Sequence, residues 1–459
     1  MNASNIDHLR VQARAETRAP RYTSYPTAVQ FGPDVDAETY AEWLVAIADD
    51  KPVSLYVHIP FCRPFCRRLC WYCGCNMQVA RGPETVTDYV KKLDREIELV
   101  FWARGRGLPV SALHLGGGSP DCLSPSDLER LFASLRDAFS LTPGMDFDVE
   151  IDPAYLNSDF IHAAGRLGLT RASLGVQTFA PEVQEAINRP QSFETVAETA
   201  TLLRDVGVKS LNFDLMYGLP RQSVSDVLST LDQAMTLRPD RIALFAYAHM
   251  PNLEPHQKRI DPDALPDAQA RLDQAEAAAS WLTEAGYMRI GLDHFALPED
   301  ALARAATAGT LHRNFQGYTT DTAETLIGLG VSAISRLPQG YAQNAHDLET
   351  WTAALDRGRL PTARGIALRD DDRLRAEAIE RLMCDGAVDV AALCRRFGVA
   401  LDAVEDVWPV LLQFEDENLV QLDGARVRVT ARGRPLVRTV CTAFDRYLDP
   451  LAGRQSRAI

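Results

Sequence analysis

Five cysteines crowd one short segment of the chain and bring several thiol groups within reach of a single metal ion or cluster. They are Cys62, Cys66, Cys70, Cys73 and Cys75, of which the middle three follow the pattern C-x3-C-x2-C. The first twenty residues lack the apolar stretch of a secretory signal. Closely spaced cysteines in a protein that is not secreted are typical of metal sites rather than of disulfides. The segment therefore predicts a metal site.

Zinc and an iron–sulfur cluster are the two candidates for this site. A structural zinc ion usually takes four ligands in two separated pairs. The remaining cysteines, Cys122, Cys384, Cys394 and Cys441, are too scattered to suggest a second pair. Bunched thiolates favour a cluster, and the C-x3-C-x2-C spacing resembles that of the radical S-adenosylmethionine (SAM) enzymes. In that superfamily three cysteines hold a [4Fe–4S] cluster whose open iron binds SAM. On this segment alone, zinc stays open.

Composition limits the kinds of partner that the chain can have. Its 459 residues suffice for two or three domains, and 46% of them are hydrophobic. The net charge of −14 argues against a nucleic-acid surface, so an anionic substrate would need a local cluster of arginines. The longest apolar run, at residues 242–248, is far shorter than the ~18 residues of a membrane span. We expect a cytoplasmic protein with no nucleic-acid or membrane partner.

Strand-like and helix-like segments alternate along the first two thirds of the chain. Apolar residues recur at helical spacing in residues 84–102 and 125–139. The strand-like runs are residues 55–59, 112–115, 147–151, 171–177, 210–217, 241–249 and 287–293. Repeated βα units predict parallel strands with right-handed crossovers. Six or more units favour a barrel or partial barrel, whose functional groups lie at the carboxyl ends of the strands.

Polar residues and glycines do lie where these strands are expected to end. They are Tyr56 and His58, the triple glycine at 116–118, Glu150, Gln177 and Asp214, and Ala248 is expected at the end of the sixth strand. Several such groups on one rim favour a ligand site. The triple glycine permits either a turn with positive φ or a close approach of the backbone to a ligand. Carboxylates such as Glu150 and Asp214 can accept two hydrogen bonds side by side, as ribose hydroxyls require.

The composition changes again near residue 364, where helical patterns begin at residues 373–383, 388–397 and 401–414. The Asp423-Gly424 pair predicts a hairpin, so this region looks like a winged helix. Its fifteen arginines nearly balance its sixteen acidic residues, which favours a lid over a DNA reader. We expect an N-terminal arm (1–50), a barrel (51–296), a barrel-closing extension (297–363) and a C-terminal α-helical domain (364–459).

A set of longer motifs resembles the oxygen-independent coproporphyrinogen III oxidase (coproporphyrinogen dehydrogenase) family of radical SAM enzymes. The motifs are Arg-Tyr-Thr-Ser-Tyr-Pro-Thr (21–27), Tyr-Val-His-Ile-Pro-Phe (56–61), Cys-Gly-Cys-Asn (73–76), Gly-Val-Gln (175–177), Asn-Arg (188–189), Asp-Leu-Met-Tyr-Gly-Leu-Pro (214–220), His-Arg-Asn-Phe-Gln-Gly-Tyr-Thr-Thr (312–320) and Gly-Val-Ser-Ala-Ile (330–334). The resemblance covers about residues 20–457. It implies an α/β fold with a partial (β/α)6 radical SAM barrel and a C-terminal, mainly α-helical domain.

The resemblance also implies a reaction. Family members are oxidoreductases that oxidatively decarboxylate two propionates of coproporphyrinogen III to vinyl groups, giving protoporphyrinogen IX in anaerobic haem biosynthesis. The implied cofactors are a [4Fe–4S] cluster and two SAM molecules, with a low-potential electron donor such as flavodoxin or ferredoxin, and the implied state is a monomer. Two alternatives remain: a radical SAM relative that acts on haem by methyl transfer or ring opening, and a non-enzymatic haem carrier. Cys75 and the 312–320 loop argue against the carrier.

Site residues carry over from the same motifs. Cys66, Cys70 and Cys73 would bind the cluster, whereas Cys75 matches a family cysteine that is no ligand. The first SAM would contact Tyr56, Gly117, Glu150 and Ile334. The second would contact Tyr72, Gly118, Ser119, Gln177, Arg189, Asp214 and Ala248.

The chain departs from the family in one place. Pro-Phe-Cys-Arg at residues 60–63 is repeated at residues 64–67, which adds four residues and one cysteine. The first cluster ligand is therefore either Cys66, by its spacing to Cys70, or Cys62, by its distance from Tyr56. Cluster geometry tolerates less error than a lengthened loop, whose added closure entropy is small. We favour Cys66.

Overall fold

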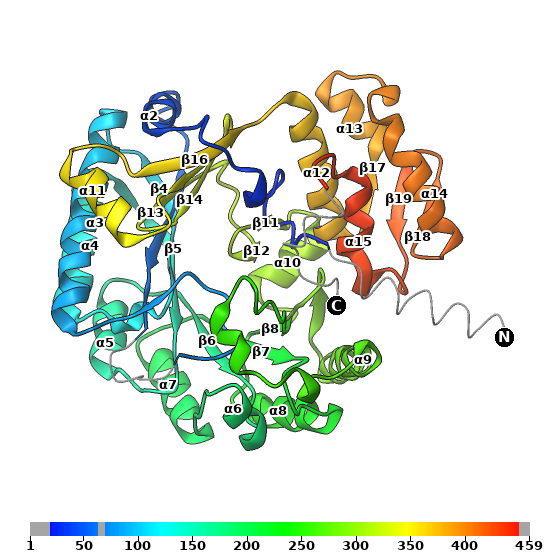
Figure 1. Cartoon of the computed structure of the whole chain (residues 1–459), viewed down its shortest axis with the longest axis horizontal. Coiled ribbons are helices and arrows are strands. Elements are labelled where there is room, and N and C mark those ends of the chain that lie inside the picture. Colours follow the sequence, from blue (N-terminus) through cyan, green and yellow to red (C-terminus); the bar gives the residue numbers. More distant parts are fainter. Residues whose placement is uncertain (1–18, 63–68, 449–459) are drawn as a thin grey trace.

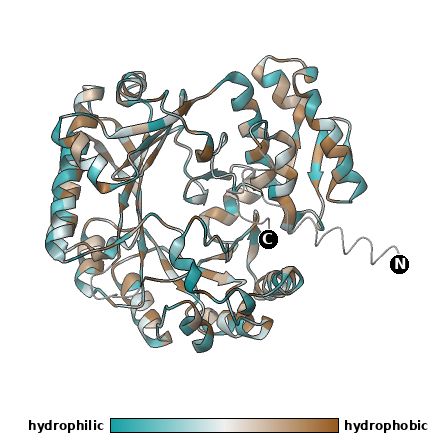
Figure 2. Cartoon of the chain, in the orientation of Figure 1, coloured by the Kyte–Doolittle hydropathy of each residue, from teal (hydrophilic) through white to brown (hydrophobic). Residues whose placement is uncertain are grey.

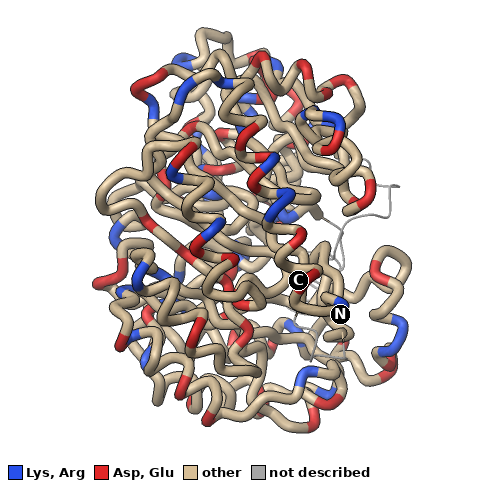
Figure 3. The backbone as a smooth tube through the Cα atoms, turned by 90° about the vertical axis from the view of Figure 1, so that its left-hand side faces the viewer, with Lys and Arg blue, Asp and Glu red and all other residues tan. Residues whose placement is uncertain are grey.

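The computed structural model describes residues 19–62 and 69–448. Figure 1 shows a large α/β body whose helices lie around the outside of a curved sheet, with a smaller, mainly helical part beside it. Within the described residues, no helix is long and apolar enough to cross a membrane. Basic and acidic residues are interspersed along the chain on the side that Figure 3 shows.

The body is built on one mixed sheet of twelve strands in the order β16-β15-β14-β13-β1-β4-β5-β6-β7-β8-β10-β9. Six neighbouring strands at its centre run parallel. They are β1 (Val53–Ile59), β4 (Pro109–Gly117), β5 (Ser140–Ile151), β6 (Arg171–Gln177), β7 (Ser210–Tyr217) and β8 (Arg241–Ala246). Helices follow each of them in the chain: α3 (Pro83–Arg104), α4 (Pro125–Ala138), α5 (Ser158–Arg166), α6 (Pro181–Ala186) with α7 (Phe193–Asp205), α8 (Val224–Thr236) and α9 (Ala268–Glu284).

Six βα units in an open, curved sheet confirm the predicted α/β fold with a partial (β/α)6 barrel. Helix α3 was predictable from the sequence because its buried apolar side chains recur at helical spacing; they include Val86, Val90, Leu93 and Ile97. It ends at Gly105, whose φ of 79° suits a glycine helix cap. The outer helices carry apolar and polar residues on different faces in Figure 2. Their apolar faces pack on the sheet.

Both edges of the parallel sheet are extended by antiparallel strands. One edge carries β13 (Thr325–Leu329), which is still parallel to β1, and then β14 (Ile334–Leu337), β15 (Gly340–Asn344) and β16 (Thr362–Ala367). The expected domain boundary at residue 364 falls inside β16. Because β16 pairs with β15 through contacts that are remote in sequence, the helical part begins only at α12 (Asp370–Asp385).

At the other edge, the single parallel strand expected at residues 287–293 is not found in the described chain. This edge forms two short antiparallel strands, β9 (Met288–Ile290) and β10 (His294–Ala296), joined by a turn at Gly291 with a φ of 55°. Strand β10 pairs antiparallel with β8. Strand β8 itself ends at Ala246, so Ala248 lies just beyond the strand rather than at its end.

The C-terminal part contains α12, β17 (Ala387–Asp389), α13 (Val390–Phe397), η5 (Leu401–Val407), α14 (Trp408–Asp416), β18 (Val420–Asp423), β19 (Arg426–Val429) and α15 (Val437–Cys441). The hairpin predicted at Asp423-Gly424 is confirmed by the antiparallel pairing of β18 with β19. The helix expected at 401–414 divides into a 3-10 segment and α14, because a proline occupies the first turn of α14.

The N-terminal segment crosses from this helical part to the body. The Tyr22 hydroxyl donates to Asp445 Oδ2 at 2.9 Å, and the Tyr25 hydroxyl accepts from the Arg446 N–H at 3.0 Å. Further on, Gly32 pairs with Gly365 in β16. Asp36 caps α2 (Ala37–Val45) by accepting from the Thr39 N–H at 2.9 Å.

Candidate active site

A cavity of about 610 Å³ lies at the carboxyl ends of the parallel strands. Most of the predicted site residues line it: Cys70, Tyr72, Cys73, Gly117, Gly118, Ser119, Glu150, Gln177, Arg189, Asp214 and Ala248. Tyr56 and Ile334 are not on its lining, and Cys66 lies outside the described residues. The structure thus brings together residues from four strands, the segments that follow β4 and β8, the cysteine segment and the loop after α6.

Three side chains from other segments hold the described part of the cysteine loop in place. Asn188 Nδ2 donates to the Leu69 carbonyl at 2.9 Å, and Gln257 Nε2 donates to the Tyr72 carbonyl at 3.1 Å. His256 Nε2 lies 2.6 Å from the Cys73 carbonyl oxygen. The last two residues were not predicted, because no motif or spacing links a segment near residue 256 to the cysteines.

The described cysteines suit an iron–sulfur cluster. Cys70 and Cys73 both line the cavity. Hydrogen bonding from Cys75, through its side chain and its N–H at 3.4 Å, lowers the pKa of Cys73 to about 7, which favours the thiolate that binds iron. Burial raises the pKa of Cys70, an effect that the Arg189 guanidinium opposes. With Cys66 outside the described residues, the described part of the chain does not complete a three-ligand group.

Arg189 ties this loop to the strand ends. Its Nη1 contacts Cys70 Sγ at 3.4 Å, and its Nη2 donates to Asp152 Oδ1 at 2.8 Å and to the Gly175 carbonyl at 2.6 Å. Burial opposes the charge of Arg189, but Asp152 and neighbouring thiol and phenol groups outweigh it and hold the pKa well above its usual value. Asp152 was not among the predicted site residues, although it lies only two residues beyond Glu150.

The triple glycine makes a tight turn against β1 and the segment after it. Gly117 has a φ of 119°, and a Cβ on it would lie 2.7 Å from the His58 ring. A Cβ on Gly118 would lie 2.6 Å from the Phe61 carbonyl oxygen. Gly117 therefore has the positive φ that favours glycine, and the backbone of Gly117 and Gly118 closely approaches β1 and the segment after it. A contact of these glycines with SAM stays a prediction.

Two carboxylates face the cavity from neighbouring parts of the sheet. Glu150 accepts from the Gly117 N–H at 3.1 Å and lies 3.3 Å from His114 Nε2. Asp214 accepts from Ser173 Oγ at 3.1 Å and from Asn212 Nδ2 at 2.7 Å. Burial, reinforced by the charge of Glu150, raises the pKa of Asp214 to about 6. The oxygens of both carboxylates can accept hydrogen bonds from ligand hydroxyls.

Tyr56 lies behind this rim, in a cluster of aromatic and histidine side chains. Its hydroxyl is 2.9 Å from His58 Nδ1, and its ring stacks on His114 with centroids 5.7 Å apart. Burial opposes protonation of His114, yet Asp148 and Glu150 raise its pKa to about 10. Ile334 lies at the start of β14. The expected contacts of Tyr56 and Ile334 with SAM stay predictions.

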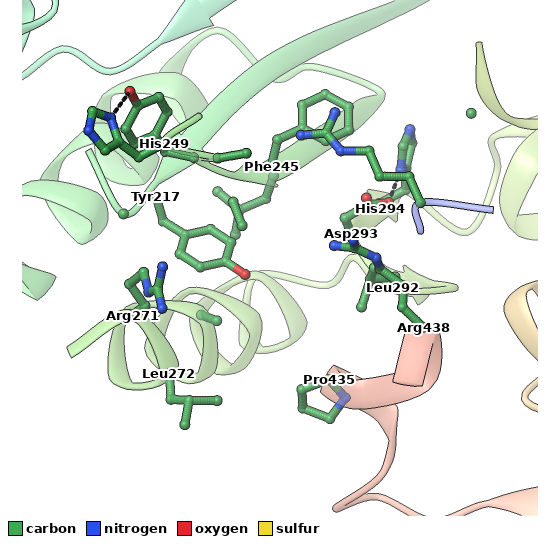
Figure 4. Close-up of a pocket in the computed structure, with 18 of the residues that line it drawn as sticks. Tyr217, Phe245, His249, Arg271, Leu272, Leu292, Asp293, His294, Pro435 and Arg438 are labelled. Carbon is green, nitrogen blue, oxygen red and sulfur yellow. Dashed lines mark hydrogen bonds and ion pairs between the residues drawn. The ribbon is translucent and has the colours of Figure 1, made fainter. Parts of the chain in front are cut away.

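A second cavity, of about 570 Å³, adjoins the first. The two share several lining residues, among them Arg21, Phe245, Ala248 and Phe315. Figure 4 shows its interior, with Arg271 and Arg438 on facing walls. A local arginine cluster was expected for an anionic substrate, but its position was not predicted, because these arginines come from segments far apart in the chain.

Comparisons with known proteins match nearly the whole chain to a single family. Residues 62–234 match the Radical SAM superfamily, and residues 368–436 match the HemN C-terminal domain. An oxygen-independent coproporphyrinogen III oxidase of Bradyrhizobium diazoefficiens is 47% identical over 97% of this chain and 98% of its own length. A protein of the same name from Pseudomonas aeruginosa is 40% identical over 95% of each chain. The chain belongs to the oxygen-independent coproporphyrinogen III oxidase family.

A solved structure of this family has the same fold. Coproporphyrinogen III oxidase (HemN) from Escherichia coli, described as a radical SAM enzyme, superposes with a TM-score of 0.88 at 38% identity, covering 93% of this chain and 98% of that one. Membership in the oxygen-independent coproporphyrinogen III oxidase family implies an oxidoreductase with a [4Fe–4S] cluster and SAM. It decides against the zinc site that the cysteine segment alone left open.

Proposed function

We propose that this chain oxidatively decarboxylates two propionates of coproporphyrinogen III to vinyl groups and so forms protoporphyrinogen IX. The observation that carries the proposal is a single rim on which Cys70, Cys73, Glu150 and Asp214 face one cavity, in a chain that matches the family over nearly its full length. Haem-directed chemistry and haem carriage, the two alternatives, gain no support from these comparisons.

Within this proposal, Cys66, Cys70 and Cys73 hold the cluster and two SAM molecules share the cavity. When bound, the cluster and SAM would supply a radical that takes a hydrogen atom from a propionate β-carbon; the substrate radical would then lose CO2 and pass its remaining electron to a one-electron acceptor, leaving the vinyl group. Glu150 and Asp214 accept the ribose hydroxyls of SAM, since both line the cavity with carboxylate oxygens. Arg189 orders the ligand loop through Cys70 and Asp152.

The N-terminal arm and the C-terminal helical part serve as a lid in this proposal. Arm residues such as Arg21, Tyr22 and Val29 line the cavity. Arg438 on α15 donates to the backbone carbonyls of Ala19 and Pro20, which fixes the arm to the helical part. A closed, dry cavity prevents a carbon radical from reacting with solvent. The chain acts as a monomer in the cytoplasm and draws electrons from a low-potential donor such as flavodoxin or ferredoxin.

The test is product analysis with the cluster rebuilt under anaerobic conditions. Purified protein receives iron, sulfide, SAM, a chemical reductant and coproporphyrinogen III, and we expect protoporphyrinogen IX and CO2. Cys70→Ser, which removes an expected ligand, is the inactive control. A methylated or ring-opened haem product would favour the haem-directed relative. Absence of SAM cleavage in the wild type, despite full iron content, would favour the carrier.

The same preparation tests the number of SAM molecules. Equilibrium dialysis with labelled SAM should give about two molecules bound for each cluster. A ratio of one in the presence of substrate would contradict that part of the proposal and leave the reaction itself untouched.

A further inference from the structure

The second cavity has a charge opposite to that of the chain as a whole. Its lining includes five arginines against two carboxylates, Glu276 and Asp293, and thus carries a formal charge of +3. The whole chain carries −14. A cationic, partly enclosed cavity in an acidic protein attracts anionic ligands to that place and to few others.

The arginines are brought together by the fold. Arg271 comes from α9, Arg289 from β9, Arg313 from β11 (His312–Asn314) and Arg438 from α15. In Figure 4, Arg271 and Arg438 lie on facing walls, and the Tyr217 hydroxyl is directed into the space between them. Four donors on separate elements surround the cavity, as the recognition of several anionic groups on one ligand requires.

Two of these arginines lack an acidic partner among the described residues. Arg289 donates from Nη2 to the Leu292 carbonyl at 3.3 Å, and its buried Nε has no hydrogen-bond partner in the described chain. Arg313 donates from Nη2 to the Arg21 carbonyl at 3.3 Å and lies over the Tyr318 ring at 4.5 Å, while its Nε and Nη1 meet no partner in that same part. Neither forms an ion pair within residues 19–62 and 69–448.

The charge of Asp293, which also lines the cavity, acts on both of these arginines, but its carboxylate forms no ion pair with either in the described part of the chain. Its Oδ1 lies 2.7 Å from His294 Nδ1, which holds that carboxylate on the histidine. Buried guanidinium groups without acidic partners are costly. A guanidinium group can donate two parallel hydrogen bonds to one carboxylate. Carboxylates of a ligand would therefore supply the acidic partners that these arginines lack.

The cavity opens directly onto the SAM-binding rim. Phe245, Ala246, Tyr247 and Ala248 line both cavities, so a ligand that spans them can place one group near Asp214 and others among the arginines. Coproporphyrinogen III is a tetracarboxylate with an apolar tetrapyrrole body. The tetrapyrrole could pack against the shared lining residues while its carboxylates reach the arginines of the second cavity.

We propose that this cavity is the propionate-anchoring half of the substrate site. In it, Arg271 and Arg289, together with Arg313 and Arg438, hold the propionates that are not reacting while one propionate reaches the first cavity. The inference rests on the proposed function, because the ligand is its substrate.

A structural role is the rival explanation for two of the four. Arg438 and Arg313 both donate to backbone carbonyls of the arm, so replacing them also loosens the arm. Arg289 instead donates within its own hairpin, to Leu292. Arg289→Gln is therefore the decisive variant, and Arg271→Gln is the second. Arg434→Gln is the matched control, because Arg434 is an exposed arginine of the same region that does not line the cavity.

The experiment measures KM and kcat for coproporphyrinogen III with the reconstituted holoenzyme. We expect Arg289→Gln and Arg271→Gln each to raise KM at least tenfold with a smaller effect on kcat, and Arg434→Gln to change KM less than twofold. Cleavage of SAM without substrate should proceed at the wild-type rate in Arg434→Gln, and it is measured in the two cavity variants as a check on their cluster and SAM binding. If Arg289→Gln loses that background cleavage, the variant is damaged beyond its substrate site and its KM cannot be used. Arg289→Lys, which keeps the positive charge, then takes its place and should show a KM close to that of the wild type.

Binding of coproporphyrin III, the stable oxidised tetracarboxylate, separates this inference from the proposed function. The wild-type holoenzyme should bind it at least tenfold more tightly than its tetramethyl ester, and Arg289→Gln should lose most of that preference. This result supports the anchoring cavity even if the wild type forms no protoporphyrinogen IX. Equal KM values in wild type and both arginine variants would overturn it. A weaker affinity for SAM instead of for the porphyrin would also overturn it, by assigning the cavity to SAM.

Discussion

Replacing Asp214 with asparagine should stabilise the protein and weaken its function at the same time. Burial of this carboxyl, together with the charge of Glu150, raises its pKa from 3.8 to about 6. A carboxyl with a raised pKa in the folded state costs stability as the pH rises through that window, because the unfolded chain ionises first. The full cost above pH 6 is about 3 kcal/mol, at about 1.4 kcal/mol for each pH unit. Solvent in the cavity reduces it to about 1–3 kcal/mol.

Asparagine removes this cost and keeps the shape of the side chain. In the absence of SAM, Asp214→Asn should therefore unfold in urea with about 1–3 kcal/mol more free energy than the wild type at pH 7.5, and the difference should shrink below about 1 kcal/mol by pH 4. The affinity for SAM should fall ~10- to 100-fold, since hydrogen bonds to a charged acceptor are worth about 1.5–3 kcal/mol.

The control is Asp232→Asn, the same change at an exposed position on α8, which should alter stability by less than about 0.5 kcal/mol. A less stable Asp214→Asn protein at pH 7.5 would refute the reasoning, because Asp214 would then be a structural acceptor for Ser173 and Asn212. An unchanged affinity for SAM would remove Asp214 from the ribose site.

Two further predictions concern the cluster loop and the glycine turn. After anaerobic reconstitution, Cys62→Ser should keep a full complement of iron and Cys66→Ser should lose it; the reverse pattern would move the first ligand to Cys62. Gly118→Ala should cost about 1–3 kcal/mol of stability, because its Cβ would meet the Phe61 carbonyl oxygen at 2.6 Å, whereas Gly32→Ala, with no described atom within 4 Å of its Cβ, should cost much less. Equal urea midpoints for the two glycine variants would contradict the steric explanation.

Local periodicity predicted most of the fold. Helix α3 was expected at residues 84–102 and spans Pro83–Arg104, because its buried face repeats without interruption. The expected strand at 287–293 failed because a positive φ at Gly291 reverses the chain in the middle of a short apolar run. The domain boundary at 364 stays a prediction; residue 364 itself lies inside β16, whose pairing with β15 is remote in sequence and leaves no local trace.

The candidate site was predictable where one topological rule applied. Parallel strands end at a common rim, so the strand pattern alone was enough to place Gly117, Glu150, Gln177 and Asp214 together. Residues that reach the rim from loops follow no such rule. His256 and Gln257 hold the cysteine loop from a segment that no motif marks.

The position of the arginine-lined cavity could not be predicted from the sequence either. Net charge indicated that an anionic substrate needs a local cluster, but the sum over a chain does not say where the cluster lies. Arg271, Arg289, Arg313 and Arg438 lie on four elements that only tertiary packing brings together. Their spacing in sequence follows from the topology of the fold and has no periodicity of its own.

The most direct test of the proposed reaction follows a hydrogen atom from the substrate. Coproporphyrinogen III carrying deuterium at the β-carbons of its propionates is incubated anaerobically with the reconstituted protein, SAM and a reductant. Mass spectrometry then measures the 5′-deoxyadenosine that forms. We expect deuterium in 5′-deoxyadenosine together with formation of protoporphyrinogen IX. Unlabelled 5′-deoxyadenosine alongside decarboxylated product, or label transfer without loss of CO2, would contradict the proposed reaction.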